Sequence, residues 1–308
     1  MFIENTFKGK YRPAYYALGL ALVMLAFLIG NIPYGFYAIA LKQMGINSTI
    51  ESDMAQIGIS GITNAEMFIF SMIPFIFGFI AIFLIIVYLH KRNWKTLVTN
   101  RERMSKNRIF AGFFFWLLAM LFAEIIFYAI SPEMYTFTFE PNGFFTFLLL
   151  GLLFIPFQAG TEELLLRGYL LQGLWWMRYR WLIIIMAASI FGILHAGNPE
   201  TDTFGGAVFI YYIGFGVFAG MWTLLDDGLE IATGVHIANN LYGAVIVSSK
   251  GSLFATPSLL RTNEISVWQT IIAWFILSVI FTLLVGKIFK FKSIKFLFQK
   301  IEKPVETL

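Results

Sequence analysis

The sequence predicts an all-α polytopic membrane protein with about eight transmembrane helices, and its composition is the first observation that does so. Of the 308 residues, 58% are hydrophobic and only 13% are charged, and the mean hydropathy is +0.75. That apolar share is far above the share typical of a soluble domain. The second observation is a series of eight apolar runs of a length that suits membrane-spanning helices. The runs cover approximately residues 14–40, 65–89, 109–130, 144–177, 182–196, 205–225, 231–249 and 267–286.

The third observation is the position of the basic residues. If the N-terminus is placed in the cytoplasm, eighteen of the 22 lysines and arginines fall on the cytoplasmic side. Cytoplasmic loops of membrane proteins carry such an excess of lysine and arginine. We therefore expect both termini to be cytoplasmic and the protein to be integral to the cell (inner) membrane. The outer loops then hold mainly acidic residues, namely Glu51, Asp53, Glu133, Glu140, Glu200 and Asp202.

The composition also excludes several classes of function. The chain contains no cysteine, which excludes thiol catalysis, disulfides and cysteine-ligated metals. Its isoelectric point of about 9.1 does not indicate nucleic-acid binding, because the basic residues gather at the ends of apolar runs. We see no linker that divides the chain, and we predict one membrane domain over residues 1–308. Within it we distinguish N-terminal scaffold helices at 1–143, a core at 144–249 that holds the candidate site residues described below, and a last helix with a basic tail at 250–308.

A short charged stretch, Thr161 to Gly168, lies inside the fourth apolar run. It contains Glu162, Glu163 and Arg167, and each charge near the membrane centre costs about 2.5–3.5 kcal/mol on insertion scales. Ionisable groups at such depth usually face one another or a water-filled cavity, so they indicate a functional site. The plainer alternative is a structural ion pair plus a spare acid at a helix start, with Thr161 as the N-cap.

Helix geometry gives the two acids different roles. Glu163 and Arg167 are four residues apart on one helix face, so they can form an ion pair. Glu162 is turned roughly 140° away from Arg167 at about 100° per residue, which leaves it free to act as a base. The run that carries these residues is about 34 residues or about 51 Å long, against a membrane core of roughly 30 Å. We therefore expect it to bend or break at Pro156 and Gly160, just before the acidic pair.

Two of the three histidines lie within or beside apolar runs. His195 follows Phe191 by four residues and His236 precedes Asn240 by four, so each pair shares a helix face. Asn239 is turned about 60° from His236 at about 100° per residue, and we do not assign it to the site. Either histidine alone would more often be a satisfied core residue, but the two together with an intramembrane acid pair favour a site.

Other polar or small residues are expected to have structural roles. His90, in a basic turn, is expected to be solvated. For Glu124, in the third run, two roles are open, one in the site and one in pairing with a partner that the sequence does not identify, and we favour the second. Gly216 and Gly220 form a G-x-x-x-G step, which is typical of close helix packing.

Three motifs, in this order, resemble the CPBP (Abi/CAAX protease) family of intramembrane proteases, whose eukaryotic members are the type II CAAX prenyl endopeptidases. The motifs are Glu162-Glu163-x-x-x-Arg167-Gly168, Phe191-x-x-x-His195 and His236-x-x-x-Asn240. The resemblance covers approximately residues 145–245, a third of the chain. Leu166 stands where many members carry an aromatic residue, a departure that leaves the charged positions intact.

The resemblance implies an intramembrane endopeptidase that acts on a membrane-associated peptide or protein, with a CAAX-type substrate as one candidate. By the resemblance, Glu162 and His195 would activate a water for attack on a peptide carbonyl. His236 and Asn240 would hold the developing oxyanion, and the ion pair described above would organise the site. Peptide hydrolysis needs such a base and such donors.

Three alternatives stay open. Glu162, His195 and His236 match the His₂Glu ligand set of a zinc hydrolase, so zinc is the alternative cofactor. Neither histidine has an obvious carboxylate partner in the sequence, and we favour a reaction without a cofactor. A non-catalytic membrane protein, such as a bacteriocin-immunity or assembly factor, is the alternative from another class. A proton-coupled transporter is less favoured because we see no paired Gly/Pro-interrupted spans in corresponding halves. The expected partners are the lipid bilayer and a membrane-associated substrate, not nucleic acid.

Overall fold

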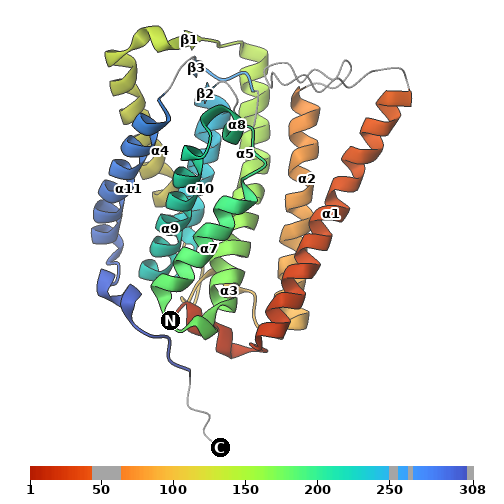
Figure 1. The fold of residues 1–308 in the computed structure, drawn as a ribbon, viewed down its shortest axis with the longest axis vertical. Coiled ribbons are helices and arrows are strands. Elements are labelled where there is room, and N and C mark those ends of the chain that lie inside the picture. Colours follow the sequence, from red (N-terminus) through yellow and green to blue (C-terminus); the bar gives the residue numbers. More distant parts are fainter. Residues whose placement is uncertain (44–63, 250–255, 263–265, 304–308) are drawn as a thin grey trace, which may run out of the picture.

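The structure is a computed structural model that describes residues 1–43, 64–249, 256–262 and 266–303 (Figure 1). Its α-helices are α1 (Pro13–Gln43), α2 (Asn64–Leu84), α3 (Lys95–Val98), α4 (Lys106–Ile130), α5 (Pro141–Glu163), α6 (Leu171–Gly173), α7 (Arg180–Leu194), α8 (Glu200–Phe204), α9 (Ala207–Asp226), α10 (Glu230–Leu241) and α11 (Val267–Phe289). Three π-helical segments extend the longer helices, namely η3 (Ile85–Leu89), η5 (Leu164–Leu170) and η7 (Tyr242–Ile246). Short 3₁₀ turns are η1 (Ile3–Lys8), η4 (Pro132–Met134), η6 (Trp175–Met177) and η8 (Ile294–Phe298).

The helical architecture confirms the prediction of an all-α polytopic membrane protein. Six helical segments among the described residues are long and apolar enough to cross a membrane, at Pro13–Tyr37, Ala65–Leu89, Lys106–Ile130, Pro141–Gly173, Ala207–Asp226 and Val267–Phe289. The other two predicted runs are also helical, but α7 has 15 residues and α10 has 12. The number of spans therefore stays a prediction, as does the cytoplasmic location of both termini. Glu51 and Asp53, expected in an outer loop, lie outside the described residues.

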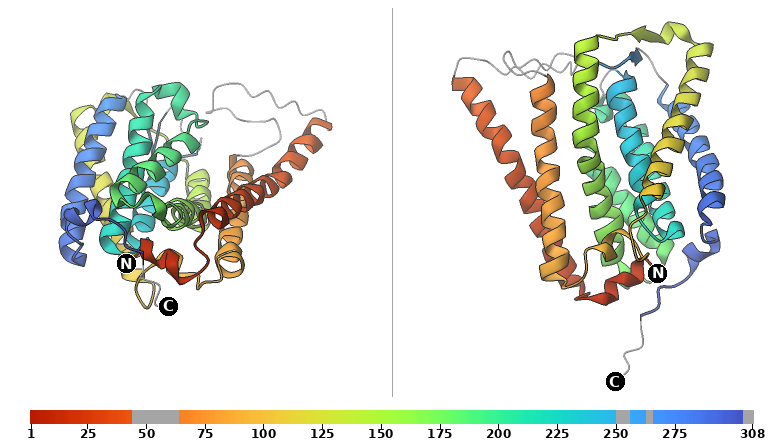
Figure 2. Two further views of the ribbon diagram at one scale, coloured as in Figure 1. Left: turned by 60° about the horizontal axis from the view of Figure 1, so that its bottom comes forward. Right: turned by 180° about the vertical axis from the view of Figure 1, so that it is seen from behind.

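Helix α10 lies in the interior of the bundle, between α4, α5 and α9 (Figures 1 and 2). Small residues let these helices approach closely. A Cβ added at Gly234 of α10 would lie 2.1 Å from the carbonyl oxygen of Ile109 in α4. One added at Gly216 would lie 2.7 Å from Cα of Ala188, so the predicted close packing of the G-x-x-x-G step is confirmed between α9 and α7. The first contact brings α10 close to α4, and the second brings α9 close to α7.

A small sheet adds to the helical architecture at the end of the bundle away from the N-terminus (Figure 1). Its strands are β1 (Tyr135–Phe137), β2 (Val247–Ser249) and β3 (Leu260–Thr262), in the order β1-β3-β2. β1 pairs antiparallel to β3, with Tyr135 opposite Thr262, and β2 pairs parallel to β3. The sheet therefore joins the ends of α4, α10 and α11.

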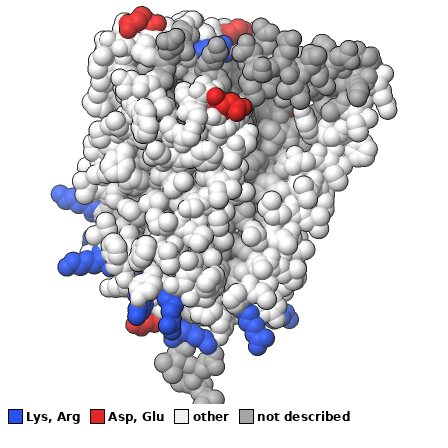
Figure 3. All heavy atoms as spheres, viewed as in Figure 1, with Lys and Arg blue, Asp and Glu red and all other residues white. Residues whose placement is uncertain are grey.

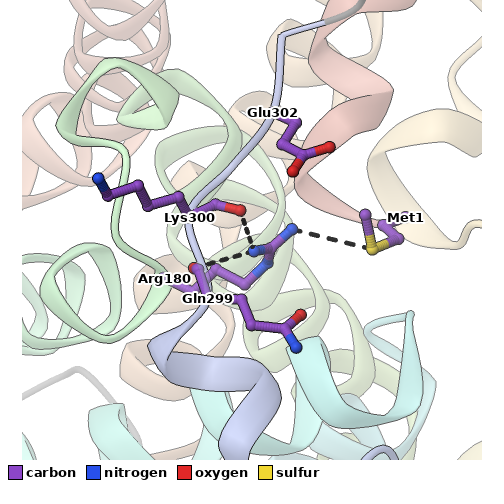
Figure 4. Close-up of a pocket in the computed structure, with 5 residues that line it drawn as sticks. All are labelled: Met1, Arg180, Gln299, Lys300 and Glu302. Carbon is purple, nitrogen blue, oxygen red and sulfur yellow. Dashed lines mark hydrogen bonds between the residues drawn. The ribbon is translucent and has the colours of Figure 1, made fainter.

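The opposite end of the bundle is rich in basic residues. On the face in Figure 3, most lysines and arginines gather at this end and most acidic residues at the other. Arg180, 1% exposed, joins the two terminal segments there, because its guanidinium pairs with Glu4 and donates to the carbonyls of Gln299 (3.0 Å) and Lys300 (2.8 Å). Figure 4 shows the surface pocket around it, lined by Met1, Arg180, Gln299, Lys300 and Glu302. Both guanidinium nitrogens of Arg180 that carry dashed lines in Figure 4 already have hydrogen-bond partners, so Arg180 has a structural role.

The corner between α9 and α10 is held by a second buried ionic cluster. Asp226 and Glu230 are 5% and 1% exposed. Arg101 pairs with Asp226 at 2.8 Å and with Glu230 at 3.0 Å, and Arg108 lies 3.1 Å from Asp226. Because these bonds tie the segment before α4 to the start of α10, they fix the depth at which α10 begins.

Candidate active site

The acidic pair lies at the end of α5, and the local geometry there differs from our expectation. We expected a bend or a break at Pro156 and Gly160. Helix α5 runs unbroken through both residues to Glu163, so a break before the acidic pair is wrong, and a bend stays a prediction. The chain leaves α-helical geometry only after the pair, in the π-helix η5, and π-helical turns are frequent at functional sites. The N-cap interpretation of Thr161 is also wrong, because Thr161 is fully buried within the helix and its hydroxyl donates to the carbonyl of Phe157.

The expected ion pair between Glu163 and Arg167 is present. Oε1 of Glu163 lies 3.1 Å from the Arg167 guanidinium, and the two residues are 0% and 1% exposed. The guanidinium also lies over the rings of Phe191 at 4.5 Å and Phe215 at 5.7 Å. Oε2 of Glu163 and both terminal nitrogens of Arg167 have no hydrogen-bond partner among the described residues, so the ion pair and its aromatic neighbours are what compensate the buried guanidinium.

His236 of α10 lies between the two glutamates. Its Nδ1 is 2.8 Å from Oε1 of Glu163, and its Nε2 is 3.6 Å from Oε2 of Glu162. An ionised carboxylate only accepts hydrogen bonds, so Nδ1 carries the proton and donates to Glu163. The Nε2 edge of the ring is therefore the edge that faces Glu162.

Gln158 joins Glu162 to Asn240, a connection that the sequence analysis missed. Its Nε2 donates to Oε1 of Glu162, and its Oε1 accepts a hydrogen bond from Nδ2 of Asn240 at 2.8 Å. Gln158 precedes Glu162 by four residues, the spacing that places two side chains on one helix face. That spacing, together with an amide in an apolar helix, was the available signal.

His195 stands at the end of α7, and its contacts assign its tautomer. Its Nδ1 lies 2.7 Å from the carbonyl oxygen of Phe191, which can only accept, so Nδ1 carries the proton when the ring is neutral. Its ring packs against those of Phe191 and Tyr212, with centroids 4.1 and 4.7 Å away. His195 interacts electrostatically with Glu162, although no hydrogen bond joins the two described side chains. Nε2 of His195 is left as the proton acceptor.

The six residues expected from the motifs thus meet within the bundle, from α5, η5, α7 and α10. Glu163, Arg167 and His236 form its buried part, whereas the side chain of Glu162 is 14% exposed. Its Oε2 has no hydrogen-bond partner among the described residues. An acid with one oxygen held and the other unpaired, beside two imidazoles and an amide, is suited to proton transfer at a polar substrate.

Glu162, His195 and His236 are the residues that would hold a zinc ion. In the described part of the chain, no group of three or more histidine, aspartate or glutamate side chains could hold a metal ion. Nδ1 of His236 donates to Glu163 and Nδ1 of His195 donates to a backbone carbonyl. Zinc-bound histidines make the same kind of bond through the ring nitrogen that does not bind the metal, so these two bonds do not decide between the alternatives. As they stand in the described part of the chain, Glu162, His195 and His236 do not form a group that could hold a metal ion.

Two polar residues outside the site also have defined partners. His90 is fully buried rather than solvated, because Nδ1 lies 2.6 Å from the carbonyl of Lys10 and Nε2 lies 2.9 Å from the hydroxyl of Tyr169. The expectation for His90 is therefore wrong. The expectation for Glu124 is confirmed, since its carboxylate accepts hydrogen bonds from the hydroxyls of Tyr135 and Tyr242.

Fold and site together define the class of this protein. It is an integral membrane protein whose polar side chains from three helices meet in the interior of an apolar bundle.

Comparison with known proteins shows which family part of the chain is similar to. Residues 141–242 match the family described as "Type II CAAX prenyl endopeptidase Rce1-like", a family of membrane proteases, which confirms the resemblance seen in the motifs. The matched segment holds all six motif residues. The "Uncharacterized protein YyaK" of Bacillus subtilis (strain 168) is 29% identical over 249 residues, which cover 79% of this chain and 81% of the relative. No solved structure matches the chain significantly.

Proposed function

We propose that this protein is an intramembrane endopeptidase that hydrolyses a peptide bond in a membrane-associated peptide or protein. The observation that carries the proposal is the position of His236 between Glu162 and Glu163, with Asn240 linked to Glu162 through Gln158. This arrangement brings an acid, two imidazoles and an amide from distant segments to one place. The family match over residues 141–242 supports the reaction class.

In this proposal Glu162 is the general base, and His195 assists it. Oε1 of Glu162 is held by Gln158, whereas Oε2 is unpaired among the described side chains and takes a proton from the attacking water. Nε2 of His195, the free acceptor of that ring, shares this proton and delivers it to the leaving nitrogen. General acid–base catalysis of this kind contributes roughly 10²–10⁴-fold to a rate.

His236 and Asn240 are proposed to stabilise the oxyanion of the tetrahedral intermediate. Because Nδ1 of His236 already donates to Glu163, its Nε2 can donate only if the ring carries both protons. A doubly protonated His236 with Arg167 would balance the charges of the two glutamates, and a buried cluster without net charge avoids an unpaired charge. Asn240 has a second amide hydrogen besides the one that it gives to Gln158.

We propose that Glu163 and Arg167 hold this apparatus in place and do not react. Glu163 orients His236 through Nδ1, and Arg167 neutralises Glu163 at 3.1 Å. Preorganised charges in a site of low dielectric constant stabilise a transition state more than the same charges in water.

We further propose that the reaction needs no metal ion, since the site carries an acid, imidazoles and an amide in the roles just described. Elemental analysis of the purified protein, together with a peptidase assay after treatment with a chelator, tests this point. We expect less than one equivalent of zinc and unchanged cleavage. Loss of cleavage on chelation with recovery on adding zinc would establish the zinc-dependent alternative.

The proposed function is tested by peptide cleavage with protein reconstituted in lipid vesicles. The family description makes a CAAX peptide the first substrate, supplied with and without a prenyl chain. Glu162→Gln should lower the rate roughly 10²–10⁴-fold. Glu124→Gln is the matched control, because it makes the same change at another acid in a membrane-spanning helix. Glu124 accepts hydrogen bonds from Tyr135 and Tyr242 and has no role in the proposed reaction. Equal cleavage by wild type and Glu162→Gln would exclude Glu162 as the base, and no cleavage by wild type of any membrane-associated peptide would refute the endopeptidase proposal.

A further inference from the structure

A chain of hydrogen bonds runs from α9 through α10 to the proposed base in α5. The hydroxyl of Tyr211 donates to Oδ1 of Asn239 at 3.1 Å. Nδ2 of Asn239 donates to Oδ1 of Asn240 at 3.5 Å, and Nδ2 of Asn240 donates to Oε1 of Gln158 at 2.8 Å. Nε2 of Gln158 closes the chain by donating to Oε1 of Glu162. Every donor in the chain therefore points toward the Glu162 carboxylate.

The chemistry of the last bond fixes the direction of all the others. An ionised carboxylate has no hydrogen to give, so Gln158 must present its amino group to Glu162 and its carbonyl to Asn240. Asn240 must then present its amino group to Gln158, and its carbonyl is left to face Asn239. Reversing any one amide would place two amino groups or two carbonyls against each other, and would leave polar groups at the site unpaired.

Within this chain of hydrogen bonds, Gln158 is the residue that sets the position of Glu162 relative to Asn240. It is 8% exposed, and it contacts both the proposed base on α5 and the proposed oxyanion donor on α10. Any buried glutamine needs hydrogen-bond partners, but a glutamine with only a packing role has no reason to bond to both the proposed base and the proposed oxyanion donor. Networks of buried hydrogen bonds are more rigid when every member is satisfied.

We propose that Gln158 is a positioning residue that holds the Glu162 carboxylate and the Asn240 amide in one fixed relative geometry. This inference rests on the proposed function and deepens it. Gln158 touches neither substrate nor water in this role. It acts by selecting one rotamer of Glu162 and one amide orientation of Asn240, with Asn239 and Tyr211 as the outer support.

The first test compares Gln158→Met with Gln172→Met in the reconstituted peptidase. Methionine keeps the length of glutamine but removes both hydrogen bonds. Gln172 is the matched control, because it is also a buried amide on the helical segment that follows α5, but it donates to backbone carbonyls of Phe2 and Thr96. We expect Gln158→Met to lower kcat roughly 10- to 100-fold with little change in KM, as misplacement of a reacting group does. A normal kcat for Gln158→Met, or an equal loss per folded molecule in Gln172→Met, would overturn the proposal.

The second test is the pH profile of Gln158→Glu. When the introduced carboxyl is protonated, it can donate to Glu162 and accept from Asn240 as the glutamine does. When it is ionised it can only accept, and it repels Glu162. We therefore expect the activity of Gln158→Glu relative to wild type to rise as the pH is lowered. A ratio that does not change with pH would contradict the role of Gln158 as a donor to Glu162.

The third test does not depend on peptidase activity. Infrared difference spectra between each protein and its Glu162→Gln counterpart isolate the carboxylate bands of Glu162. We expect Gln158→Met to shift these bands and Gln172→Met to leave them in place. Unchanged bands in Gln158→Met would overturn the proposal. If the wild type cleaved no peptide, the proposed function would fall, while these spectra would still decide whether Gln158 orients Glu162.

Discussion

Among the described residues, Arg167 and His236 are the two side chains at ion-pair distance from Glu163. Replacing Arg167 by methionine removes the guanidinium and leaves only His236 beside this acid. Glu163 is 0% exposed, so its charge would be left in a medium of low dielectric constant. Breaking a buried ion pair by removing one partner costs roughly 3–5 kcal/mol. The guanidinium also lies 4.5 Å from the centre of the Phe191 ring, and such a contact contributes about 0.5–2 kcal/mol. We expect the free energy of unfolding to fall by at least about 3 kcal/mol.

Adding Glu163→Gln to Arg167→Met separates the two contributions. The double variant has no unpaired acid, and the glutamine carbonyl can still accept from Nδ1 of His236. We therefore expect the double variant to regain most of the loss and to remain only about 1–2 kcal/mol below wild type, because the contact with Phe191 stays lost.

Denaturant titration in mixed micelles, followed by tryptophan fluorescence and circular dichroism, measures these free energies for the wild type, for Arg167→Met and Glu163→Gln alone, and for the double variant. The coupling free energy comes from the double-mutant cycle. A fall of less than about 1 kcal/mol in Arg167→Met, the range of an exposed pair, would refute the inference that the pair is buried. A double variant no more stable than Arg167→Met would refute the charge argument.

Three further predictions test other parts of the molecule. Burial lowers the pKa of His90 to about 4, so the unfolded chain binds its proton first as the pH falls. Between about pH 6.5 and about pH 4, the free energy of unfolding of the wild type should therefore fall by about 3 kcal/mol more than that of His90→Gln. Denaturant titrations at each pH would detect this difference, and equal losses in the two proteins would contradict the prediction. Glu124→Leu should lower the free energy of unfolding by roughly 1–3 kcal/mol, because two tyrosine hydroxyls lose their acceptor, and an unchanged value would contradict that. Because the chain has no cysteine, single cysteines at Glu133 and Lys295 report topology: an impermeant maleimide should label only the former in intact cells, and the reverse pattern would invert the orientation.

The sequence was sufficient for features that depend on local spacing. The apolar runs predict the helices, and the spacing of Glu163 and Arg167 predicts their ion pair. The same reasoning placed His195 and His236 on defined helix faces. These predictions succeed because helical periodicity sets which side chains share a face, whatever the rest of the fold does.

Features that depend on packing between distant segments were not predicted. His90 is buried because residue 10 and the π-helix that carries Tyr169 both close over it, and nothing near His90 in the sequence indicates that. Because of its position on the helix, Asn239 was not assigned to the site. It nevertheless belongs to the chain of hydrogen bonds, since it accepts from Tyr211 on another helix. The role of Gln158 needed the position of Asn240 as well as its own spacing from Glu162. Helical geometry also did not predict the π-helical segment Leu164–Leu170 after Glu163.

The identity of Glu162 as a base, and not a nucleophile, is tested most directly by a single turnover of the enzyme in water enriched in oxygen-18. If Glu162 removes a proton from water, the new carboxylate of the product gains one heavy oxygen and the Glu162 side chain gains none. Mass spectrometry of the product and of the peptide that contains Glu162 measures both. Product without the label, together with a labelled Glu162, would show that the carboxylate attacked the peptide itself and would contradict the mechanism proposed for this site.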